Sequence, residues 1–203
     1  QLVFYLKYFV LIRELLKESL NDIPDYLNEI IHYIGKAYIF LWGSIKESLL
    51  FNGNHDSDLS DFDKYLNLYK YKFTNEKYEL GGYSILKNKN IIIAMDCGST
   101  PDKKYSNSYQ SGPLSFEAIH KGNKIICNSG YFQNQNHKLN TISRSTVAHS
   151  TLILNNKSAS TFKKKNKKTI LENGFKSFNK NLVYEKNFWS IKGSHNGYQK
   201  EFG

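Results

Sequence analysis

Cysteine and proline are scarce in this chain, and their scarcity excludes several classes of protein. The 203 residues include two cysteines, Cys97 and Cys127, and three prolines. Two cysteines exclude a disulfide scaffold and a four-cysteine zinc site, and we expect both to be free, buried thiols. So few prolines exclude collagen-like and proline-rich classes. The chain is long enough to bury a core without such staples.

Long apolar runs and arginine are also missing. No stretch of 18 apolar residues occurs, so we expect no membrane span. The net charge of +10 comes almost entirely from lysine, because Arg13 and Arg144 are the only arginines. The excess fits either a compositional bias without a partner or a field that attracts polyanions. Nucleic-acid readers rely on arginine, so nucleic acid is the less favoured polyanion.

Helical periodicity dominates the first fifty residues. Apolar residues recur at three- and four-residue steps over 2–16 and again over 27–41. Between them, Asp22-Ile23-Pro24 resembles a helix start with proline in the first turn. The pattern predicts two antiparallel helices. Both apolar stripes are broad, so we expect the helices to pack against more than each other.

Residues 54–77 are polar, and we interpret them as a linker with a short helix. The segment carries Asp56, Asp58, Asp61 and Asp63 at intervals of two or three. Such carboxylates could suit a calcium ion, but the loop glycine and closing glutamate of a calcium motif are absent.

The period changes to two from about residue 78. Strands at 78–86 and 91–96 flank one polar turn, and strands at 114–120 and 124–127 flank another. Further strands are predicted at 150–154, 182–191 and 197–202, with a charged turn or edge at 163–168. We therefore predict an α+β multidomain chain, with a helical segment at 1–53, a linker at 54–77 and an antiparallel β-sandwich at 78–203.

No nucleotide-binding loop, serine-hydrolase elbow or zinc-protease motif occurs. Five other stretches stand out, in this order: Leu50-Phe51-Asn52-Gly53, Leu114-Ser115-Phe116-Glu117, Asn128-Ser129-Gly130, the segment from Arg144 to Thr151, and Ser194-His195-Asn196-Gly197-Tyr198. Together they resemble the C-terminal β domain of the heparinase II/III-like polysaccharide lyases. In that family the β-sandwich follows an α/α toroid. The resemblance implies that residues 1–53 are the end of a toroid and that helical part and sandwich are both truncated.

The resemblance implies β-elimination on an acidic, uronate-containing polysaccharide. This chemistry needs neutralisation of the sugar carboxylate, a base such as Tyr or His, and an acid for the leaving oxygen. Much of that machinery lies in the family's toroid, so the parent protein is the expected lyase and this fragment alone is expected to be inactive. The resemblance also implies a periplasmic or cell-envelope location.

The family's metal-binding residues carry over only in part. Its His-x-His pair falls on Ser108 and Gln110, its strand-end Asp falls on Asn128, and its later His is kept as His149. Amide oxygens are poor zinc ligands. We therefore expect no zinc and no other cofactor, and instead a hydrogen-bonded polar cluster of Gln110, Asn128 and His149.

The same correspondence suggests the site residues. We expect His149, Tyr109 and Gln110 to be catalytic candidates, with Tyr109 a base only if its pKa is lowered. We expect Arg144, Gln110 and Asn128 to bind substrate.

Arg144 has a second interpretation. Its planar fork suits a substrate carboxylate, or alternatively a buried pair with Glu117 or Asp96.

Two other functions compete with the lyase. The lost histidines also fit a non-catalytic carbohydrate-binding or cell-envelope assembly protein. The basic charge also fits a nucleic-acid-binding domain, which predicts binding that weakens steeply with salt.

Overall fold

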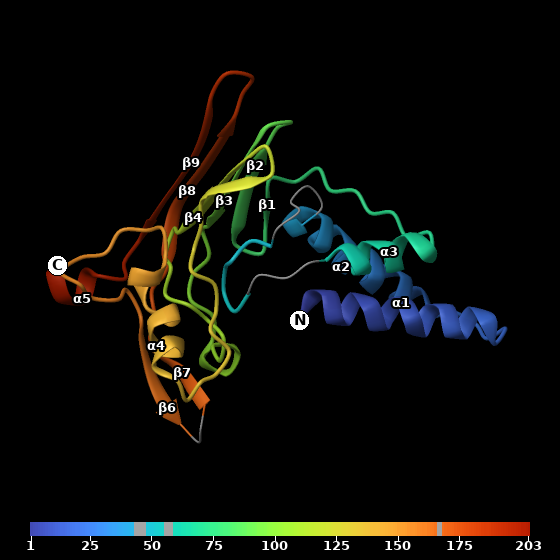
Figure 1. Ribbon diagram of the computed structural model, residues 1–203, viewed down its shortest axis with the longest axis horizontal. Helices are drawn as coiled ribbons and strands as arrows, with labels where there is room; N and C mark the ends of the chain where they lie inside the picture. Colours follow the sequence, from blue (N-terminus) through green and yellow to red (C-terminus); the bar gives the residue numbers. More distant parts are fainter. Residues whose placement is uncertain (43–47, 55–58, 166–167) are drawn as a thin grey trace. The chain divides into compact units, whose positions relative to one another are not determined.

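The computed structural model describes residues 1–42, 48–54, 59–165 and 168–203, which fall into two compact units (Figure 1). The first comprises the described residues within Gln1–Ser48 and Ser57–Lys77, and the second those within Leu49–Asp56 and Tyr78–Gly203. The predicted class, a short helical part and an antiparallel β part, is confirmed. The units divide the chain differently from the predicted ranges, because residues 49–53 belong to the β unit and most of 54–77 to the helical unit.

The helical unit contains α1 (Leu2–Glu18), α2 (Asp25–Trp42) and α3 (Ser60–Leu68). The two predicted helices are confirmed, and α2 starts directly after Pro24. The helices share one apolar core, made of these buried residues: Leu6, Val10, Leu27, Ile31, Tyr38, Phe62 and Leu66. The Tyr38 hydroxyl donates a 2.6 Å hydrogen bond to Asp63 Oδ1, which fixes α3 on α2. The segment expected to be a linker is therefore partly core.

The described residues of the acidic segment do not support a calcium site. Asp56 and Asp58 lie outside them. Asp61 pairs with Lys64 at 2.9 Å, and Asp63 accepts the bond from Tyr38.

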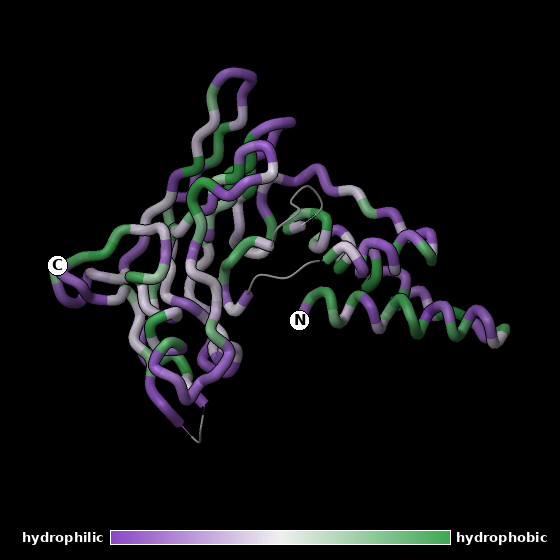
Figure 2. The backbone as a smooth tube through the Cα atoms, viewed as in Figure 1, coloured by the Kyte–Doolittle hydropathy of each residue, from purple (hydrophilic) through white to green (hydrophobic). Residues whose placement is uncertain are grey.

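One face of α1 remains apolar and exposed. Phe4, Tyr8 and Leu15 follow helical spacing and are 58%, 46% and 54% exposed. Figure 2 shows the corresponding alternation of hydrophobic and hydrophilic colour along this helix. An exposed apolar face of this kind suits packing against a further apolar surface, as the broad apolar stripe in the sequence predicted.

The helical core yields a test by paired leucine truncation. Leu6→Ala empties a site that is 0% exposed, so we expect a loss of about 3 kcal/mol in the free energy of unfolding. Leu15→Ala, on the same helix but exposed, should cost less than about 0.5 kcal/mol. Urea unfolding followed by far-ultraviolet circular dichroism measures both. Equal losses would contradict the described core.

The β unit is built from three antiparallel sheets. β1 (Glu79–Leu80), β2 (Tyr83–Lys87), β3 (Ile91–Asp96), β4 (Phe116–His120) and β5 (Asn123–Ile126) form one sheet in sequence order. Two further hairpins are β6 (Thr161–Lys165) with β7 (Lys168–Asn173), and β8 (Ser177–Tyr184) with β9 (Trp189–His195). Short helices join them: η1 (Lys103–Tyr105), α4 (Lys138–Arg144), η2 (Thr146–Ala148) and α5 (Gln199–Phe202).

The β2–β3 and β4–β5 hairpins lie close to their predicted positions. The strand predicted at 78–86 is divided at Gly81-Gly82 into β1 and β2, and the one predicted at 182–191 contains the turn between β8 and β9. Residues 150–154 form no strand, because the backbone N–H and hydroxyl of Ser150 are bonded to Asn128 and Phe116. Residues 197–202 form a turn followed by α5 rather than a strand, because Tyr198 is drawn into the core and its hydroxyl donates to the Leu152 carbonyl at 3.2 Å. Of the charged run at 163–168, residues 163–165 belong to β6 and Lys168 to β7, while 166–167 lie outside the described residues.

Two smaller predictions can be compared with the structure. Cys97 and Cys127 are free thiols as expected, but Cys127 is exposed rather than buried. In the described part of the chain, no helix combines the length and apolar character needed to cross a membrane.

Candidate functional site

The carboxamide of Gln110 lies at the centre of a buried polar cluster in the β unit. Its Oε1 accepts a 3.0 Å hydrogen bond from the Gly53 backbone N–H. Its Nε2 donates to the Gly130 carbonyl at 3.0 Å and to the Ser143 carbonyl at 2.7 Å. The side chain is 1% exposed. One amide therefore joins three segments that are far apart in sequence to its own.

Gly53 is required at this junction for a backbone reason. Its φ is +89°, a region that favours glycine, and an added Cβ would lie 2.7 Å from Ser108 Oγ. The motif Leu-Phe-Asn-Gly thus supplies the turn that brings a backbone donor to Gln110.

A second buried group, Glu117, organises the neighbouring strand end. Its Oε1 accepts from the backbone N–H groups of Leu50 and Asn128, at 3.0 and 3.1 Å, and from Asn128 Nδ2 at 3.2 Å. Lys124 Nζ lies 3.8 Å from Oε2. Burial raises the pKa of Glu117, and the bonds from Asn128 and the charge of Lys124 oppose that rise.

Asn128 connects Glu117 to the segment that carries His149. Its Oδ1 accepts a 3.1 Å bond from the Ser150 backbone N–H, while its Nδ2 donates to Glu117. Both ends of the amide are therefore occupied.

His149 is held as a neutral imidazole. Its ring packs against Gly112, where an added Cβ would lie 3.0 Å from His149 Cγ. Burial lowers the pKa of His149 to about 4, while a hydrogen bond to the Ser143 backbone opposes the shift. Its Nε2 is buried and has no hydrogen-bond partner among the described residues.

The three residues predicted to cluster do lie in one network, but the described residues show no direct bond between them. Gln110 and His149 meet at the Ser143 backbone. Asn128 reaches the same region through Ser150. Backbone groups, rather than side-chain pairing, join the set.

This donor set does not fit zinc. Both amide oxygens are already acceptors of protein hydrogen bonds, which leaves only the imidazole of His149 as a strong ligand. Within the described ranges, no group of three His, Cys, Asp or Glu residues is placed to hold a metal ion.

Tyr109 lies in the core rather than in a cleft. It is 7% exposed and its ring packs 6.4 Å from that of Phe162, measured between centroids. Burial, followed by the nearby Asp96 and Tyr83, raises the pKa of Tyr109. A base would need the opposite shift, so in this conformation the hydroxyl stays protonated.

Arg144 is anchored in the protein by backbone carbonyls. It ends α4, which begins after His137 caps the Leu139 N–H. Nη1 donates to the Asn107 and Thr169 carbonyls, both at 2.9 Å, and Nη2 donates to the Ser106 carbonyl at 2.8 Å.

The expected ion pair of Arg144 with Glu117 or Asp96 is therefore wrong. The guanidinium is 0% exposed and stacks 4.2 Å from the Phe162 ring centroid. Carbonyl dipoles and an aromatic face take the place of a carboxylate. Burial lowers the pKa of Arg144.

Sequence reasoning missed a group that adjoins Gln110. Asn52 Nδ2 donates to Asp96 Oδ2 at 2.6 Å and to the Tyr83 hydroxyl at 2.9 Å. The Gln110 N–H reaches Asn52 Oδ1 at 3.4 Å. Burial raises the pKa of Asp96 to about 6, against bonds from Gly98 and Asn52 and the charge of Lys180. The available signal was the Asn-Gly pair at 52–53.

Comparison with known proteins places the chain in a family. The sequence profile of "Heparinase II/III-like, C-terminal" matches residues 74–203, more than half of the chain. The chain belongs to this family. No curated protein matches it closely enough to be counted as a relative.

Solved structures show the same fold. The crystal structure of the heparan sulfate lyase HepC from Pedobacter heparinus is similar with a TM-score of 0.69 and 16% identity, over 98% of this chain and 33% of that one. The crystal structure of heparinase III is similar with a TM-score of 0.59 and 17% identity, over 96% of this chain and 37% of that one. The chain thus spans about a third of the length of these proteins.

The cluster yields a stability test. Gln110→Ala removes three buried hydrogen bonds and leaves their backbone partners unsatisfied, so we expect a loss of about 3 kcal/mol. Gln135→Ala is the matched control, because Gln135 is only partly buried and makes one 3.2 Å bond to Asn107; it should cost less than about 0.5 kcal/mol. Chemical denaturation measures the free energy of unfolding of both variants. A near-neutral Gln110→Ala would mean that the network is not formed.

The shifted pKa of His149 yields a pH test. The folded state favours neutral His149 down to about pH 4, whereas an unfolded histidine takes up a proton near 6.5. The unfolded state then binds more protons between these values, so stability from this group is present above pH 6.5 and is lost as pH falls to 4. His149→Gln lacks this titrating group. The free energy of unfolding of the parent chain, relative to that of His149→Gln, should therefore fall by about 2 to 3 kcal/mol as the pH is lowered from 7 to 4.5.

Asp96→Asn is the control of opposite sign for the pH test. Because the pKa of Asp96 is raised, this group contributes stability that is fully present when the pH is below the ordinary aspartate pKa of 3.8. That contribution is lost as the pH rises through about 6. Thermal unfolding of the three proteins across this range measures both effects. A pH-independent difference for His149→Gln would contradict the buried imidazole.

Proposed function

We propose that this chain is the C-terminal part of a polysaccharide lyase that cleaves an acidic, uronate-containing polysaccharide by β-elimination. The observation that carries the proposal is the family match over residues 74–203. The fold shared with a solved heparan sulfate lyase supports it. The chain's net charge of +10 suits an acidic substrate.

Within this proposal, the described β residues position the site and do not perform the proton transfers alone. His149 is neutral but its free Nε2 is buried, and a pKa near 4 makes a weak base at neutral pH. Tyr109 has a raised pKa, and the amides of Gln110 and Asn128 have no acidic proton. Base and acid then come from helical residues outside this chain.

The proposed part of Gln110 is to hold the 49–54 segment, which carries the Leu-Phe-Asn-Gly motif, in a fixed place against the β unit. Arg144 does the same for residues 106 and 107. Both are positioning residues. Arg144 binds backbone in this conformation, so substrate recognition by its guanidinium would require release of those carbonyls.

The helical unit fits a larger helical domain. Phe4, Tyr8 and Leu15 leave an apolar face on α1 that further helices would bury. We propose that this domain is the toroid of the family and that the enzyme acts in the periplasm or cell envelope.

The lyase proposal is tested with the full-length gene product and this chain side by side. Each is incubated with alginate, a polyuronate, and with heparan sulfate, and the absorbance of unsaturated uronate is followed. We expect turnover of at least one polymer by the full-length protein and none by this chain. Turnover by the isolated chain would show that its own residues suffice and would overturn the division of roles.

A non-catalytic carbohydrate-binding function is the second candidate. It is favoured by the replacement of the family's metal-binding residues by Gln110 and Asn128, both already engaged in protein hydrogen bonds. A full-length protein that binds these polymers without any elimination product would establish it in place of the lyase.

A further inference from the structure

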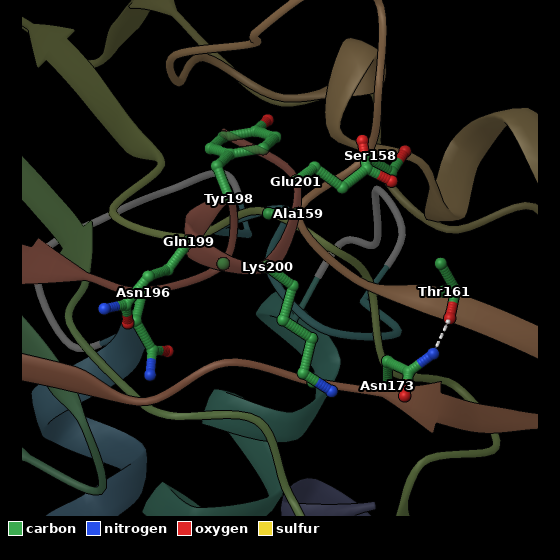
Figure 3. Close-up of a pocket in the computed structure, with 11 residues that line it drawn as sticks. Ser158, Ala159, Thr161, Asn173, Asn196, Tyr198, Gln199, Lys200 and Glu201 are labelled. Carbon is green, nitrogen blue, oxygen red and sulfur yellow. Dashed lines mark hydrogen bonds between the residues drawn. The ribbon is translucent and has the colours of Figure 1, made fainter. Parts of the chain in front are cut away.

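A pocket of about 270 Å³ opens at the foot of the β6–β7 hairpin and is lined by none of the Gln110, Asn128 and His149 side chains (Figure 3). It lies between the hairpin and the segment that leads into α5. Its polar side chains include hydroxyls, amides and a cation: Ser158, Thr161, Asn173, Asn196, Gln199 and Lys200. Such a mixture suits a hydroxyl-rich ligand with a negative charge.

Several of these groups are fixed before any ligand arrives. Asn173 Nδ2 donates to Thr161 Oγ1 at 3.0 Å, and Asn196 Oδ1 accepts from the Lys176 N–H at 2.8 Å. Tyr198, which also lines the pocket, is 8% exposed. The wall is therefore organised in advance, which lowers the entropy cost of binding.

The pocket has an uncompensated positive charge. Its one acid, Glu201, forms a 2.8 Å ion pair with Lys157. Lys200 extends from α5 towards the side of the pocket where Asn173 lies (Figure 3), and no acid among the described residues pairs with it. An anionic group in the pocket would meet this ammonium.

The hairpin continues the positive charge on the same face. Side chains alternate along a strand, so Thr161, Lys163 and Lys165 share one side of β6. The other side carries Phe162, which pairs with Leu171 and packs on the core. The lysines therefore lead away from the pocket on its own face, and Figure 2 shows the outer end of this hairpin in hydrophilic colours.

The cation row is costly for the protein alone. Lys165 and Lys168 stand directly opposite each other, and like charges in that position destabilise a hairpin. Within the described residues, Glu172 is the one acid that compensates this row, 3.3 Å from Lys163 Nζ. A polyanion along the row would remove the repulsion.

We propose that the pocket and the outward lysines of β6–β7 form a binding site for an acidic polysaccharide, with one charged sugar in the pocket and the chain continuing along Lys163, Lys165 and Lys168. The proposal rests on the proposed function only for its ligand class. The site would hold the polymer on the β unit independently of the Gln110 cluster. Lysine rather than arginine in the row favours a sugar polyanion over nucleic acid.

The experiment measures binding by this chain, with no turnover needed. Alginate and heparan sulfate are titrated into the chain by isothermal calorimetry at low salt, with neutral dextran and a short DNA duplex as comparators. Using both charged polymers distinguishes a carboxylate ligand from a sulfated one. We expect binding to at least one of them and none to dextran.

Matched variants locate the site. The double substitution Lys165→Gln with Lys168→Gln should weaken binding about tenfold and reduce its salt dependence. Lys186→Gln with Lys192→Gln changes the net charge equally on the β8–β9 hairpin and should weaken it less than about twofold. Lys200→Gln tests the pocket and should weaken binding about fivefold. Thermal unfolding verifies that each variant is folded.

The outcomes separate this site from the lyase proposal. Equal weakening by the two double variants, no effect of Lys200→Gln, or DNA binding as tight as polysaccharide binding would each overturn the site. A full-length protein that cleaves polymer while this chain binds none would overturn the site alone. Binding at the hairpin without turnover by the full-length protein would leave the site standing and overturn only the lyase.

Discussion

The β unit depends on the hydrogen bonds that buried polar side chains make to segments distant in sequence. Gln110 and Glu117 are almost fully buried, and each collects donors or acceptors from segments distant in sequence. An unpaired carboxylate or amide in such a place would cost several kcal/mol. The backbone of residues 49–54 is therefore fixed by two side chains that come from different parts of the β unit. The loop-rich region from 97 to 115 is held by the bonds of Gln110 and by those of Arg144 to the Ser106 and Asn107 carbonyls, rather than by a strand ladder.

Sequence patterns predicted what period and turn chemistry control. The two helices, the 83–96 hairpin and the 116–126 hairpin follow from apolar spacing and polar turns. The strand predicted at 197–202 failed because a single tyrosine, Tyr198, is captured by distant carbonyls. A period-two sequence pattern cannot predict such a contact, because the contact depends on where residues 152 and 157 lie in three dimensions.

The candidate site was predictable as a set of residues but not as a set of partners. Motif order selected Gln110, Asn128 and His149, and the structure connects all three through nearby backbone groups. Arg144 shows the opposite case. Its charge suggested a carboxylate partner, yet three carbonyls and the Phe162 ring surround it. Every residue carries a backbone carbonyl, so the residue types in a sequence cannot predict which carbonyls will accept hydrogen bonds from Arg144.

The amides at 110 and 128 change what the cluster can do, because of their hydrogen-bond valence. A histidine or an aspartate offers a strong lone pair to a metal or a proton, whereas an amide offers one weak acceptor and two donors. Gln110 uses its donors on two carbonyls and its acceptor on one N–H, and Asn128 is engaged at both ends in the same way. Such a network gains rigidity, and the neutral His149 fits it because a buried imidazolium would have no counter-charge in this cluster. We propose that what remains to the β unit is the placement of polar groups and, through the lysines of β6–β7, the attraction of a charged polymer.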